Sequence, residues 1–223
     1  MLRLRIFAAP LVAFFAFCSG SERQVVDTFL TAVQAGNQET VKAVSVVAFP
    51  GNVSSWEVVE VGPVSSRPFK LAELESNFSK VMGERKVEQE KNDYFRQEHQ
   101  RAFDEYTVKR EKDPEYEFSG EMADFQKEWE ARESKHKELD HAAMDLQKEI
   151  DHLRSSARLS ASTNVNENFE GEVSERELTV KINDGSADKL YTFTIQKFSI
   201  VDTKRDIRPI GRWVISQFQE KET

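Results

Sequence analysis

The chain has 223 residues, a net charge of −8 and 39% hydrophobic residues, which allows one domain with an elaboration but no large core. Duplex-binding surfaces need a concentrated basic patch, and the sequence contains none, so we expect no nucleic-acid partner. Charged residues make up 31%, yet the apolar content is too high for a wholly disordered chain.

Residues 1–20 are predicted to be a signal peptide or lipobox with a short tether. MLRLR carries two arginines, and the run IFAAPLVAFFAF that follows has the length of a signal-peptide apolar region. This run is too short to span a bilayer comfortably. The protein is therefore expected to be exported to the cell envelope, or secreted.

Cys18 is the only cysteine and lies between the apolar run and the polar SGSE. This placement resembles the lipobox of bacterial lipoproteins, in which the cysteine is lipidated, although Phe15 and Phe17 depart from the usual pattern. The resemblance implies a periplasm-facing, membrane-anchored lipoprotein with lipid attached at Cys18. Ordinary secretion after cleavage at Ser21 and an uncleaved anchor remain as alternatives. If Cys18 is lipidated or removed, the mature chain has no thiol for disulfides or nucleophilic catalysis.

Residues 21–67 are predicted to form the first half of an α+β domain. Apolar residues recur at helical spacing over residues 21–35, Gly36 is a stop signal, and Asn37 is a candidate cap for a second helix. The stretch SSWEVVEVGPV at residues 54–64 favours a strand.

Residues 161–223 are predicted to supply three antiparallel strands. Leu178, Val180 and Ile182 alternate with polar residues, and Tyr191 and Phe193 do so after a turn that contains Asn183-Asp184-Gly185. The last strand, RWVISQF, is expected to place Trp213 and Ile215 on one face and Val214 and Phe218 on the other.

This order of elements resembles the nuclear-transport-factor-2-like (cystatin-like cone) superfamily. VVDTFLTAVQAGNQETVKAV is similar to the opening helices of exported bacterial members, and GRWVISQF is similar to their closing strand. The resemblance covers only the two ends of the chain, and it implies N-terminal helices packed into the concave face of a small antiparallel sheet. Enzymes of the superfamily place Asp, His or Tyr inside the cone. The two ends contain no histidine, so no catalytic residue is carried over and no enzyme is predicted.

Residues 68–160 are predicted to form an antiparallel coiled-coil hairpin inserted after the first strand. Two series step by three and four residues, as a coiled-coil seam requires. The first is Leu71, Leu74, Phe78, Val81, Arg85, Glu88, Asn92, Phe95, His99, Ala102, Tyr106, and the second is Met122, Phe125, Trp129, Arg132, His136, Leu139, Ala143, Leu146, Ile150, Leu153. Asp113-Pro114 separates the two series, so the chain is expected to turn there after an arm of about 40 residues.

Folding the hairpin near Pro114 matches apolar residues at both ends and polar residues in the centre. Asn92 then faces His136, and His99 faces Trp129, where the two rings are expected to stack. A simple spacer does not need a polar centre, so the predicted partner-binding residues are Arg85, Asn92, His99, Trp129 and His136. Contact with a protein partner and self-association both remain open, as does a pH-sensitive interface built on the inward histidines.

Three Glu-x-x-His pairs raise the question of a di-metal site, which helical bundles build from such pairs on inward faces. The pairs end at His136, His141 and His152, and the predicted seam directs only His136 inward. Two helices cannot enclose a metal, so no metal or cofactor is predicted.

The prediction for function is therefore a non-catalytic binding or interaction protein of the cell envelope. The alternative is a small-molecule-binding protein, or a cone-type enzyme, that uses a pocket in the α+β domain. The aromatic residues available to line such a pocket are Trp56, Tyr191, Phe193 and Trp213.

Overall fold

The computed structural model describes residues 20–221 and confirms an α+β fold with an antiparallel sheet. The elements are α1 (Gly20–Gln34), α2 (Gln38–Val44), β1 (Ser55–Val61), β2 (Ser65–Pro68), α3 (Leu71–Glu98), α4 (Gln100–Lys112), α5 (Glu121–Ala161), β3 (Phe169–Asn183), β4 (Asp188–Asp202) and β5 (Val214–Glu220). The sheet order is β1-β3-β4-β5, with β2 also paired to β3. The predicted signal peptide and Cys18 lie outside the described residues.

The helical hairpin follows β1 but is separated from it by a short second strand, β2, so its predicted position directly after the first strand is only partly confirmed. Gly62-Pro63 ends β1, and the chain then resumes pairing with β3 as β2. All four residues of β2 are exposed, so this strand lacks the apolar alternation that reveals a strand in a sequence.

The N-terminal helices bury the predicted apolar stripe against the sheet. Phe29 and Leu30 on α1 are fully buried, and the Phe29 ring contacts Phe193 of β4 edge to face at 6.1 Å. Asn37 caps α2 as predicted, because its side-chain oxygen accepts a hydrogen bond from the Thr40 N–H at 3.0 Å. The buried residues of α1 and the sheet form one core layer.

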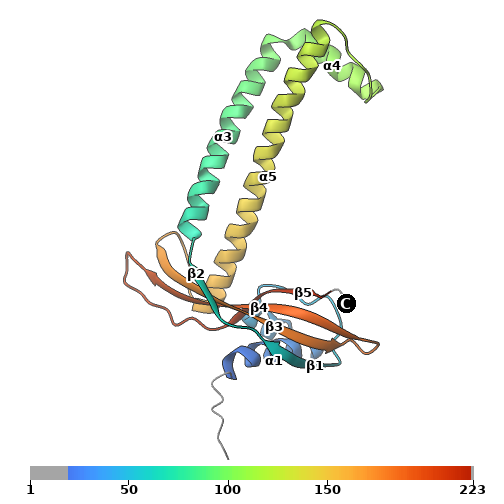
Figure 1. Cartoon of the computed structure of the whole chain (residues 1–223). Helices are drawn as coiled ribbons and strands as arrows, with labels where there is room; N and C mark the ends of the chain where they lie inside the picture. The colour runs from blue at the N-terminus through green and yellow to red at the C-terminus, as the bar shows by residue number, and fades with distance from the viewer. Residues whose placement is uncertain (1–19, 222–223) are drawn as a thin grey trace, which may run out of the picture.

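The long ribbon formed by β3 and β4 buries opposite faces at its two ends. Leu178 pairs with Phe193 and faces α1, whereas Val173 pairs with Phe198 and faces the base of the hairpin. Pairing between β3 and β4 is continuous from Val173 to Leu178. Successive side chains of a strand point to opposite faces, so these two residues, five positions apart, lie on opposite faces of the sheet. Figure 1 shows the result: the hairpin rises from one side of the sheet and α1 lies on the other.

The hairpin is anchored to the sheet through the C-terminal end of α5. Ser160 is fully buried; its hydroxyl donates to the Arg212 carbonyl at 2.6 Å and accepts from the Phe198 N–H at 3.1 Å. The Phe198 ring meets Phe69 edge to face at 5.8 Å. A buried polar bridge and an aromatic contact thus fix the base of the hairpin.

The first arm of the hairpin is shorter than predicted. Instead of continuing to Pro114, α3 ends at Glu98, a bend at His99 follows, and α4 leaves at an angle (Figure 1). The bend lets Phe103 of α4 pack edge to face on Trp129 of α5 at 5.0 Å. We call α3 and α5 together the arm; α5 alone, with 41 residues, is about 60 Å long. None of the helices in residues 20–221 is long and apolar enough to cross a membrane.

The last strand contains a bulge that changes one predicted face. Ile195 pairs with Ile215 but Thr194 pairs with Gln217, which leaves Ser216 as the extra residue. The bulge puts Phe218 against the same core layer as Ile215, so the prediction that they face opposite sides is wrong.

Candidate functional site

The centre of the arm holds a small polar network. Arg85 on α3 forms an ion pair with Asp140 on α5, and the second oxygen of that carboxylate lies 3.2 Å from Nδ1 of His136. All three side chains are partly buried. The network links the two helices where sequence reasoning expected a polar seam, with Asp140 as a member that the seam pattern did not include.

Asn92 lies in the same part of the seam and is buried. Its Oδ1 atom has no hydrogen-bond partner among the described residues. It lines a hollow of about 290 Å³ together with Arg85, Trp129 and His136. A buried amide oxygen without a partner costs free energy.

Replacing Asn92 with leucine should therefore raise the free energy of unfolding by about 1 kcal/mol, since the isosteric apolar side chain removes an unpaired polar group. Urea unfolding followed by circular dichroism measures the change. Asn77→Leu, at an exposed position of the same helix, controls for helix propensity. Equal effects of the two variants would show that the buried amide carries no penalty.

Aromatic side chains gather at the far end of the arm, where α4 folds over it. We call this cluster the head; it comprises Phe95, Ala102, Phe103, Tyr106, Met122, Phe125 and Trp129. Trp129 stacks on Phe95 at 6.3 Å, whereas the His99 ring lies against Phe95 at 4.5 Å and Phe125 at 6.1 Å. The predicted stacking of His99 on Trp129 is thus replaced by stacking of Phe95.

Charged and polar side chains lie over the outer surface of the head. Glu130 accepts hydrogen bonds from Gln126 at 2.8 Å and Arg110 at 3.0 Å, and these partners hold the pKa of its carboxyl below the ordinary value. Burial raises the pKa of the neighbouring Tyr106 hydroxyl. The Arg132 guanidinium lies 4.4 Å from the centre of the Phe95 ring, a cation–π contact. The head is therefore an ordered, folded cap.

An apolar hollow of about 560 Å³ runs between α3 and α5 below the polar network. Its floor includes Phe78, Met82, Ala143 and Met144, and Arg85 and Lys137 belong both to it and to the hollow at Asn92. The two hollows adjoin at these two residues, and we call them together the arm groove. On α3 the groove extends over 19 residues from Phe78 to Arg96, a length of about 27 Å.

The four aromatic residues predicted to line a pocket pack in or against the core layer beneath α1. Phe193 is fully buried, Trp56 donates a hydrogen bond to Asp27 at 2.9 Å, and Tyr191 donates one to Glu220 at 3.2 Å. Trp213 is partly buried against the same layer. Tyr191 borders a hollow of about 460 Å³ that also touches Phe49.

The remaining histidines lie apart from one another. His141 is exposed, and desolvation together with the nearby Arg67 guanidinium lowers the pKa of His152. Within residues 20–221, no three His, Cys, Asp or Glu side chains gather in a way that could hold a metal ion.

Sequence reasoning named Arg85, Asn92, Trp129 and His136, which line the groove, but missed Met82 and Met144 because these two residues lie beside the seam. Met82 and Met144 each follow a seam position by one residue, where a coiled coil is usually polar. Methionines at such positions were the available signal. Neither a family model nor a curated protein nor a solved structure matches this chain.

Proposed function

We propose that the protein is a non-catalytic, lipid-anchored binding protein of the cell envelope that holds an amphipathic helix of a partner protein in the arm groove. The observation that carries this proposal is the groove itself, which runs along about five helical turns between two antiparallel helices and is apolar at its Phe78 end and polar at its Asn92 end. A third helix laid into it would complete a three-helix bundle and bury the methionines, which adapt readily to different side chains.

The arrangement of the layers supports an anchored protein of this kind. The helix that begins two residues after Cys18 packs on one face of the sheet, and the arm leaves the other face (Figure 1). Lipid at Cys18 would therefore leave the groove accessible to a partner. We further propose that the domain beneath the arm is of the nuclear-transport-factor-2-like type, since two helices precede and cover an antiparallel sheet.

Replacing Met144 with lysine should weaken partner binding roughly 10-fold or more, because a charge would enter an apolar interface. Val87→Lys is the matched control: Met144 is 51% exposed and lines the groove, whereas Val87 is 49% exposed on α3 and does not line it. The measurement is the yield of in-cell crosslinks from a photoreactive amino acid at Gln147, which lines the groove. Loss of the crosslink in M144K alone is the expected result.

Two outcomes would contradict the proposal. Equal crosslinking by M144K and V87K would show that the groove is not used, and a crosslinked product of two copies of this chain would indicate self-association instead. Replacing residues 82–144 with a short loop should also abolish the crosslinked partner. This deletion keeps Leu71 and Ile150, whose side chains cover Val173 and Phe198 at the base of the arm.

A second candidate function, small-molecule binding, is favoured by the hollow of about 460 Å³ beside Tyr191 and Phe49. Its size suits a small ligand. Native mass spectrometry of the purified chain tests it: a bound small molecule that is lost in Tyr191→Ala would support this function over the first.

A further inference from the structure

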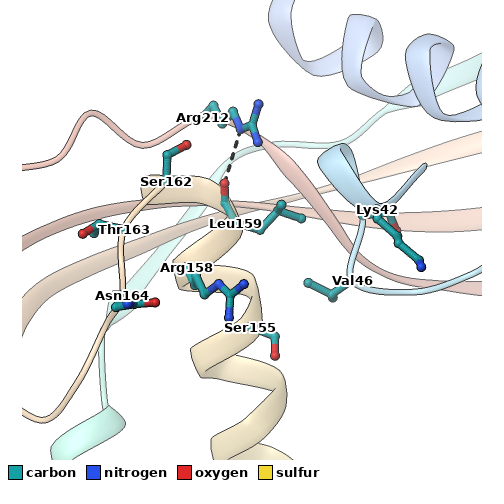
Figure 2. Close-up of a pocket in the computed structure, with 10 residues that line it drawn as sticks. Lys42, Val46, Ser155, Arg158, Leu159, Ser162, Thr163, Asn164 and Arg212 are labelled. Atoms are coloured by element: carbon teal, nitrogen blue, oxygen red, sulfur yellow. Dashed lines mark hydrogen bonds between the residues drawn. The ribbon is translucent and has the colours of Figure 1, made fainter. Parts of the chain in front are cut away.

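A hollow of about 690 Å³ lies on the sheet side of the arm, far from the head. It forms where α2, the C-terminal end of α5 and the segment before β5 meet. Figure 2 shows Lys42 on α2, Ser155 and Arg158 on α5, Thr163 and Asn164 just after it, and Arg212 on the third segment. Three segments distant in sequence thus contribute to one concave surface, which we call the basic pocket.

The charge of this surface is opposite to that of the chain. Lys42, Arg158 and Arg212 line the pocket, and none of the described lining residues is acidic. No ion pair is formed by Lys42 or Arg158 within residues 20–221, whereas Arg154, one turn earlier on α5, pairs with Glu75. The net charge of the whole chain is −8, whereas three cations and no acidic side chain line this one hollow.

Arg212 is held in place by backbone carbonyls rather than by a carboxylate. Its Nη2 donates to the Ala43 carbonyl at 2.9 Å and its Nε to the Leu159 carbonyl at 3.3 Å, while its backbone N–H donates to the Ser160 carbonyl at 3.0 Å. Figure 2 shows the bond to Leu159. These bonds occupy carbonyls at the C-terminal, negative ends of α2 and α5, and no carboxylate pairs with Arg212 among residues 20–221.

We propose that the basic pocket binds a phosphate-bearing anion. Arginine and lysine are the preferred partners of phosphate oxygens, and the hydroxyls of Ser155 and Thr163 and the amide of Asn164 supply further donors on the same surface. The volume exceeds that of inorganic phosphate, so the pocket has room for a phosphate with an organic group or for two linked phosphates. This site is separate from the arm groove and does not depend on its function.

Isothermal titration calorimetry with pyrophosphate tests the proposal on the full-length chain in a nonionic detergent. The double variant Lys42→Ala/Arg158→Ala should bind roughly 10-fold more weakly or worse, since it loses two charge-assisted hydrogen-bond donors. Arg212 is left unchanged because it caps α5. Lys80→Ala/Lys204→Ala removes two exposed cations outside the pocket and should bind as the unaltered chain does. Raising the salt concentration should weaken binding.

A second measurement distinguishes a free phosphate compound from a lipid headgroup. The same variants are titrated with detergent micelles that contain phosphatidylglycerol and with micelles that lack it. Pocket-dependent binding of either pyrophosphate or phosphatidylglycerol supports the site and identifies its source. Absence of binding in both titrations, or binding that the pocket variant and the control share equally, would overturn the proposal.

Discussion

Replacing Phe198 with alanine should lower the free energy of unfolding by about 3–5 kcal/mol. The side chain is fully buried between the sheet and the base of the arm, where its ring meets Phe69. Its loss leaves a cavity between these two layers. We therefore expect hydrogen exchange to increase chiefly in the last turns of α5 and in the first turn of α3, with unfolding measured in urea.

Phe193→Ala is the matched control for this prediction. Phe193 is also fully buried on β4, but on the opposite face, against Phe29 of α1. A loss of similar size is expected, with faster hydrogen exchange in α1 instead of α5. The same pattern of exchange in both variants would show that the two core layers unfold as one unit, which would contradict the prediction.

Gly171→Ala should be about as damaging, with a loss of about 2–5 kcal/mol. Gly171 has φ of 143°, a conformation that residues with a side chain rarely adopt, and an added Cβ would overlap the Ser199 carbonyl oxygen and lie 2.9 Å from Cα of Ile200. Both contacts involve the backbone of the paired strand, so neither can move without breaking the ribbon. Thermal unfolding measures the loss.

The same substitution at Gly83 should have the opposite sign. Gly83 lies in the interior of α3, and an added Cβ would meet no atom within 4 Å. Alanine there should stabilise the chain by about 0.5–1 kcal/mol, because it restricts the unfolded state and favours the helix. A loss at both positions would show that helix geometry in the arm, rather than steric space, controls the result.

Local chemistry explains which parts of the fold were predictable from sequence. Asn37 caps a helix through a hydrogen bond with a residue three positions away. Apolar and polar residues alternate around Val180 because one face of that strand is buried in the core. The existence of the helical hairpin likewise follows from its seam. Features of this kind depend on near neighbours along the chain, which a single sequence displays directly.

The bend at His99 depends on distant neighbours and was not predictable in the same way. Neither proline nor glycine marks the position, and the Asp113-Pro114 turn further on was the stronger local signal. The chain bends earlier because Phe103 gains an aromatic partner in Trp129, 26 residues later. Tertiary packing of this kind overrides helix propensity. The candidate sites share this limitation, since the basic pocket combines residues 42, 158 and 212.

Because α5 is long and continuous, a small rotation at its base produces a large displacement at its far end. This helix is unbroken from Glu121 in the head to Ala161 at the sheet, so its fixed end around Ser160 is a pivot. A rotation of 5° at the pivot would displace the opposite end of a 60 Å rod by about 5 Å. Arg158, in the basic pocket, lies half a turn from that pivot. A ligand that tilted the base of α5 by a few degrees would therefore displace the head by more than the diameter of a water molecule.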